Sequence, residues 1–125
     1  MADLDDVCHI VASLPESTFE RGEDDAVGAS VAGKAFAFTW NQRVEPRKPR
    51  VVRPDVLVVR VAGEGAKQEL VAADPEKFFT EAHYNGYPAV LVRLAAVDAE
   101  ELRELLTDAW RTRAPKRLLA ELDDA

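Results

Sequence analysis

The sequence predicts an α+β fold of two layers, in which helices cover an antiparallel sheet mainly on one side. Segments that alternate apolar and polar residues, as half-buried strands do, are joined by short turns. Helical spacing recurs at the start, briefly in the middle and over the last third. The order helix, strands, short helix, strands, two helices is typical of α+β proteins. With 125 residues and no visible repeat or linker, residues 1–125 are expected to form a single domain.

The first element is expected to be an amphipathic helix that begins after Asp3 and ends at Pro15. Asp3 is a suitable N-cap, and proline is common where a helix stops. The apolar residues at helical spacing are Leu4, Val7, Cys8, Val11 and Leu14. Cys8 is therefore expected to be a small core residue, as most unpaired cysteines are.

Two antiparallel strands follow, joined by a tight turn at Gly33-Lys34. A short extended segment at residues 18–20 and a turn at residues 22–25 precede them. The alternating apolar residues are Val27, Ala29 and Val31 in the first strand and Phe36, Phe38 and Trp40 in the second. This alternation places the three rings on one strand face. Residues 41–55 contain three prolines, which lack the N–H that a central strand donates, so a loop or a projecting edge hairpin is expected there.

The second half of the chain continues the pattern of strands followed by helices. The expected elements are a buried strand over residues 56–61, a short helix over 66–73, a capped turn at 74–76, two phenylalanines packed on the sheet at 78–79, a turn at 83–88 and a strand over 90–94. Asp98 and Glu101 form a capping-box pattern before a helix over residues 99–110. Trp110 lies on its apolar stripe, which predicts a core residue, and Pro115 begins a terminal helix.

The charges are distributed unevenly. The formal net charge is −7, which by itself disfavours a polyanionic partner. However, two short stretches each carry a net charge of +4, and the other 107 residues carry −15. The cations are Arg43, Arg47, Lys48, Arg50 and Arg53 in the first stretch and Arg111, Arg113, Lys116 and Arg117 in the second. If both stretches meet on one face they can attract phosphates, because salt screens the exposed acidic charges that lie more than about 8–10 Å away. If the stretches lie apart, the case for a phosphate-binding surface weakens.

Several kinds of function have no support in the sequence. Cys8 is the only cysteine, so neither an intramolecular disulfide nor a multi-cysteine zinc site can form. The two histidines show no ligand-like spacing with carboxylates, and no phosphate-binding glycine loop is present. We therefore expect no metal, no cofactor and no enzymatic activity.

The location of the protein is expected to be cytoplasmic. The first six residues contain three aspartates and no basic residue, whereas a secretory leader begins with basic residues. The longest apolar runs are far shorter than the ~20 residues that span a membrane.

The turn His83-Tyr84-Asn85-Gly86-Tyr87-Pro88 has two interpretations. The simpler one is turn chemistry at Asn85-Gly86, with the two tyrosines covering the edge of the core. The functional one is a platform of rings beside guanidinium groups, suited to stacking bases or gripping a peptide.

The chain resembles the MmcQ/YjbR-like family over nearly its whole length. The matching segments are Leu14-Pro15-Glu16, Gly33-Lys34-Ala35-Phe36, the turn at residues 83–88, Val90-Leu91-Val92-Arg93-Leu94, and the C-terminal run from Glu101-Leu102 through Ala109-Trp110-Arg111 to Ala114-Pro115-Lys116-Arg117-Leu118. The resemblance implies a two-layer α+β fold described as a double wing, in proteins commonly labelled DNA-binding. The matching positions with functional side chains are Lys34, His83, Tyr84, Tyr87, Arg93, Arg111, Lys116 and Arg117.

Two functional hypotheses result. The first is a non-enzymatic nucleic-acid-binding module, in which both basic stretches contact phosphates and give weak, nonspecific, salt-sensitive binding to DNA. The alternative is a protein-interaction or adaptor domain, with a homodimer as one form of it, that uses an exposed sheet face or edge. An exposed apolar patch formed by the rings of the second strand would support the alternative, and burial of those rings would remove its motivation.

Overall fold

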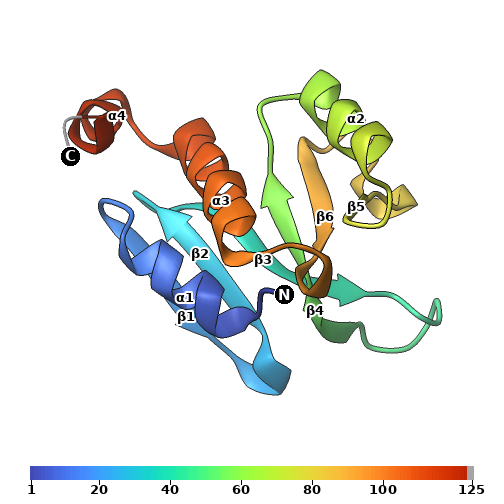
Figure 1. Ribbon diagram of the computed structural model, residues 1–125. Helices are drawn as coiled ribbons and strands as arrows, with labels where there is room; N and C mark the ends of the chain where they lie inside the picture. Colours follow the sequence, from blue (N-terminus) through green and yellow to red (C-terminus); the bar gives the residue numbers. More distant parts are fainter. Residues whose placement is uncertain (124–125) are drawn as a thin grey trace.

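The computed structural model, which describes residues 1–123, confirms the α+β prediction (Figure 1). A six-stranded sheet, antiparallel between all neighbours, has the strand order β1-β2-β3-β4-β6-β5. The strands are β1 (Ser17–Arg21), β2 (Val27–Val31), β3 (Lys34–Gln42), β4 (Val51–Arg60), β5 (Phe78–Phe79) and β6 (Ala89–Arg93). The α-helices are α1 (Leu4–Ala12), α2 (Glu64–Ala73), α3 (Ala99–Arg113) and α4 (Lys116–Asp123). Residues 78–79 are thus an edge strand of the sheet itself.

The helix starts agree with the capping residues in the sequence. Asp3 and Asp6 form a complete capping box at α1, since each side chain accepts a hydrogen bond from the other residue's backbone N–H. At α3 only half of the predicted box forms: Asp98 accepts from the backbone N–H of Glu101 at 2.8 Å, whereas the Glu101 carboxylate pairs with Lys77.

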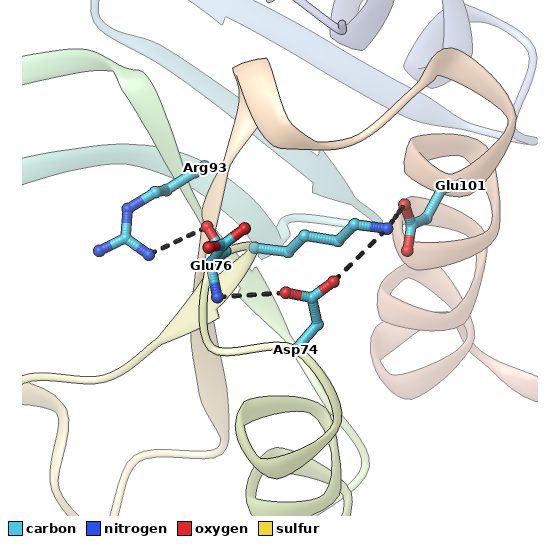
Figure 2. Close-up of polar contacts among 5 residues, drawn as sticks. Asp74, Glu76, Arg93 and Glu101 are labelled. Atoms are coloured by element: carbon cyan, nitrogen blue, oxygen red, sulfur yellow. Dashed lines mark hydrogen bonds and ion pairs between the residues drawn. The ribbon is translucent and has the colours of Figure 1, made fainter.

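The turn between α2 and β5 is tied to both layers by polar contacts (Figure 2). The Lys77 ammonium lies 2.9 Å from the Glu101 carboxylate on α3 and 3.8 Å from that of Asp74. Arg93 on β6 donates to the carbonyls of Pro75 and Glu76, and its guanidinium lies 4.1 Å from the centre of the Phe79 ring. These contacts hold the short edge strand β5 against its neighbours.

The sheet carries an apolar cluster on each face. The larger cluster lies under the helices and includes Trp110, which is fully buried as predicted and donates its indole N–H to the Pro15 carbonyl at 3.1 Å. Along β4, Leu57 and Val59 face the helices, whereas Val56 and Val58 face the other side. There they pack in a smaller cluster with Trp40, Tyr84, Ala89 and Leu91, bordered by Phe38, Phe79 and Tyr87. The second face is therefore covered by aromatic side chains.

Two expectations about the core are wrong. Phe36, Phe38 and Trp40 do not share one face, because Ala29 pairs with Ala37 and Ser30 with Ala35, which leaves Phe36 as the extra residue of a β-bulge. Phe36 consequently lies in the helix-side core, while the other two rings lie in the smaller cluster. Cys8 is half-buried and is not part of the buried core.

The proline-containing segment forms a projecting hairpin, but it joins the interior strands β3 and β4 and is not at an edge of the sheet. Strands β3 and β4 extend into it and continue to pair at Gln42 and Val51, beyond an irregularity at which Trp40 faces Arg53. In Figure 1 the hairpin reaches away from the helices at one end of the sheet. Within residues 1–123 there is no helix with the length and apolarity needed to cross a bilayer.

Candidate nucleic-acid interface

The first basic stretch forms the β3–β4 hairpin, and its cations partly shape it. Arg43 donates to the carbonyls of Pro46 and Lys48, at 3.2 and 3.1 Å. The Lys48 ammonium is 3.8 Å from Glu45, and Arg53 donates to the Gln42 side chain. These contacts occupy only some of the N–H groups, since each guanidinium has five. We call residues 43–53 the basic hairpin.

Arg50 places the basic hairpin beside the turn at residues 83–88, which we call the motif turn. One guanidinium N–H of Arg50 donates to the Asn41 carbonyl at 3.0 Å. Both residues line an open pocket of about 470 Å³ together with Phe38, His83, Tyr84 and Tyr87. This pocket, called the aromatic pocket below, brings together two features that the sequence shows separately.

Aromatic contacts fix the rings of the motif turn. His83 meets Tyr84 edge to face with ring centroids 4.9 Å apart, and Tyr84 and Tyr87 are 6.0 Å apart. Tyr84 is 7% exposed and forms a buried wall of the aromatic pocket, whereas His83 is exposed and forms its rim. Burial raises the pKa of the Tyr84 phenol, and the Glu81 carboxylate adds to this effect. The phenol is therefore neutral near pH 7. Tyr84 and Tyr87 cover the core edge, as the simpler interpretation of the turn predicts.

A buried lysine holds the motif turn from behind. Lys67 of α2 is 1% exposed, and its ammonium donates to the carbonyls of Tyr84 at 2.7 Å and Tyr87 at 3.1 Å. We did not predict this residue from the sequence. The signal was its spacing: Lys67 precedes Leu70 and Val71 by three and four residues, so it lies on the apolar side of the helix.

The second basic stretch lies at the opposite end of the molecule. Arg111 lines a cleft of about 690 Å³ with Val59 and Val61 at the far end of β4, whereas Arg53 lies at the hairpin end of the same strand. On β3, Gln42 pairs with Val51 of the hairpin and Ala37 pairs with Val59 at the cleft, so five residues of strand, roughly 17 Å, separate the two ends. Figure 1 shows α4 and the hairpin at opposite sides. The two basic stretches therefore do not converge.

The cations near α4 differ from one another in their contacts and exposure. Arg117 forms an ion pair with Glu16, and the hydrogen bond between them lowers the pKa of the Glu16 carboxyl. Arg113 is half-buried, and its Nε is buried with no hydrogen-bond partner in the described part of the chain. Lys116 is exposed at the start of α4. Among residues 1–123 there is also no cluster of three side chains suited to hold a metal ion.

The geometry defines a class of protein: a small two-layer α+β domain with a basic hairpin next to an aromatic pocket. The YjbR family model matches residues 12–112. The uncharacterized proteins Rv2570 of Mycobacterium tuberculosis and Mb2600 of Mycobacterium bovis are each 39% identical over 121 residues, which is 95% of this chain and 94% of theirs. The crystal structure of Deinococcus radiodurans protein DR2400, a DUF419 domain, is similar with a TM-score of 0.65 and 26% identity, covering 98% of this chain and 89% of that one. The chain belongs to the YjbR family.

Proposed function

We propose that this protein is a non-enzymatic nucleic-acid-binding module and that the basic hairpin is its phosphate-contacting wing. The observation that carries the proposal is the position of this hairpin, which projects beyond the sheet with five cations and one carboxylate, Glu45. Phosphate contacts by Arg and Lys position a protein on nucleic acid without reading its sequence. The expected binding is therefore weak and nonspecific, and the setting that we propose is the cytoplasm.

The net charge of −7 is compatible with this local contact. Exposed charges farther than about 8–10 Å from a phosphate are largely screened at physiological salt. The C-terminal stretch lies at the other end of β4, roughly 17 Å along the sheet from the Gln42–Val51 pair of the hairpin, and Arg117 is already paired with Glu16. We therefore assign the contact to the hairpin alone and no longer to a joint surface with Arg111, Arg113, Lys116 and Arg117.

A pair of multiple variants tests this assignment. In the first, Arg43, Arg47, Lys48, Arg50 and Arg53 are replaced by Gln; in the matched control, Arg111, Arg113, Lys116 and Arg117 are replaced by Gln. Fluorescence anisotropy with labelled duplex DNA, single-stranded DNA and RNA measures binding at low salt. We expect the hairpin variant to lose binding and the control to retain it within a few fold. Equal loss in both variants would contradict the assignment.

The alternative, a protein-interaction domain, has lost part of its motivation. Phe36 and Trp40 are 1% and 9% exposed, so the rings of β3 do not form the exposed patch on which that hypothesis depended. β1 is an edge strand, but Glu20 and Arg21 place charges there, and charged edges usually resist pairing. Size-exclusion chromatography with light scattering over a range of protein concentrations tests self-association directly.

A further inference from the structure

The phosphate contacts of the hairpin do not explain why an aromatic pocket lies beside it. The pocket volume of about 470 Å³ lies within the range of small-ligand sites, about 300–1,000 Å³. It opens on the sheet face away from the helices, where Phe38, Tyr84 and Tyr87 belong to the smaller apolar cluster.

The walls of the pocket fit a flat ring. Tyr84 is held edge to face by His83 and lies beside Tyr87, so the rings keep fixed orientations. Exposed His83 and half-buried Phe38 offer ring surface to a ligand. Stacking on such side chains tolerates any base, because every base has a π-face.

The polar groups of the pocket fit the rest of a nucleotide. Arg50 is anchored at the pocket by one hydrogen bond to the Asn41 carbonyl, which leaves further guanidinium N–H groups to contact a phosphate. The Tyr84 hydroxyl is protonated near pH 7 and can both donate to and accept from the edge of a base. The neighbouring cations of the basic hairpin extend this positive surface along a nucleic-acid backbone.

The pocket is also rigid before any ligand arrives. Lys67 donates to the carbonyls of Tyr84 and Tyr87, and Gly86 adopts a φ of +80° that allows the tight turn between them. The Arg60 guanidinium lies 5.1 Å from the centre of the Tyr87 ring and donates to its hydroxyl. Rings that are already ordered lose little entropy on binding, which favours affinity.

From these observations we infer that the aromatic pocket binds one unpaired nucleobase of a single-stranded nucleic acid, with a neighbouring phosphate on Arg50. The inference rests on the proposed function and makes it more specific. A base-paired duplex keeps its bases stacked inside the helix, so only a single strand can fill the pocket without the cost of unpairing. The protein then prefers single strands, although the hairpin contacts phosphates of both forms.

The test compares a labelled twelve-residue oligothymidylate with a twelve-base-pair duplex of the same strand. His83→Ala removes an exposed ring from the pocket rim. The matched control is His9→Ala, which removes the second exposed histidine, located on α1. We expect tighter binding to the single strand than to the duplex. His83→Ala should weaken single-strand binding about 5- to 150-fold, as the loss of one stacked base does, and change duplex binding less than twofold. His9→Ala should change neither.

A second measurement does not depend on a variant. Titration of the protein with thymidine monophosphate to millimolar concentration should shift the NMR signals of the Tyr84, Tyr87 and His83 rings. The pocket inference is overturned, and the hairpin proposal is left intact, by any one of three results. These are equal affinity for both nucleic-acid forms, an equal effect of His83→Ala on both, and no shift of these ring signals. If the protein binds neither nucleic acid, the pocket inference and the hairpin proposal are both overturned.

Discussion

Replacement of Lys67 by Met tests whether a buried ammonium holds the motif turn. Methionine keeps the length of the side chain but cannot donate to the carbonyls of Tyr84 and Tyr87. Two charge-assisted hydrogen bonds of about 1.5–3 kcal/mol each are lost, which together is about 3–6 kcal/mol. The effective penalty of burying the ammonium, about several kcal/mol, is removed at the same time.

The remaining bonds of the two carbonyls limit the net effect. Tyr84 also accepts from the Tyr87 N–H at 3.0 Å, and Tyr87 also accepts from the Ala89 N–H at 2.8 Å, so the substitution leaves neither carbonyl unsatisfied. We expect Lys67→Met to lower the free energy of unfolding by about 1–2 kcal/mol. Urea denaturation at pH 7 measures this change.

Hydrogen exchange of single amides gives the local result. The Tyr87 and Ala89 amides should exchange faster in Lys67→Met, because the carbonyls that accept from them are held less firmly. Lys77→Met is the control: Lys77 pairs with Glu101 at the surface, far from these carbonyls, so both amides should keep their exchange rates. If Lys67→Met has the stability of the unchanged protein and the same exchange rates at both amides, the ammonium does not hold the turn.

Three further substitutions test particular contacts. Trp110→Phe removes the hydrogen bond to the Pro15 carbonyl and leaves a gap in the core, so thermal unfolding followed by circular dichroism should show a loss of about 2 kcal/mol. Gly86→Ala should cost about 1 kcal/mol in urea denaturation, since the φ of +80° strains an L-residue while no atom lies within 4 Å of the added Cβ. Glu16→Gln should destabilise the protein at pH 7 but not at pH 2: Arg117 lowers the pKa of Glu16, so the contribution of the ion pair is present above the ordinary carboxyl pKa and is lost as the pH falls through the lowered value. A difference between the two proteins that persists at pH 2 would refute this explanation.

Local patterns were sufficient to predict most elements of the fold. The alternation at residues 27–31 predicts β2, and the spacing of leucines behind Asp98 predicts α3, because both patterns record which face of an element is buried. The bulge at Phe36 was missed because it depends on how β3 pairs with β2, and the sequence of one strand does not specify its pairing register with a neighbour.

The candidate site was predictable in its parts but not in its assembly. Arg50 and the motif turn each stand out in the sequence, yet they meet only because β3, β4 and β6 are neighbours in the sheet. Lys67 was missed because its partners are carbonyls 17 and 20 residues away, in a turn whose geometry local patterns do not specify. The separation of the two basic stretches likewise follows from the position of α3 and α4 relative to β4.

The salt dependence of duplex DNA binding, measured by anisotropy for the protein and its hairpin variant, tests most directly whether the basic hairpin contacts phosphates. The hairpin has five cations, so the slope of log K against log salt should be no steeper than about −4.5, at about −0.9 for each phosphate contacted. We expect measurable binding at low salt with a slope of this size, and we expect both to disappear in the hairpin variant. Absence of binding at low salt, or a slope that the hairpin variant leaves unchanged, would contradict the claim that the basic hairpin is a phosphate-contacting wing.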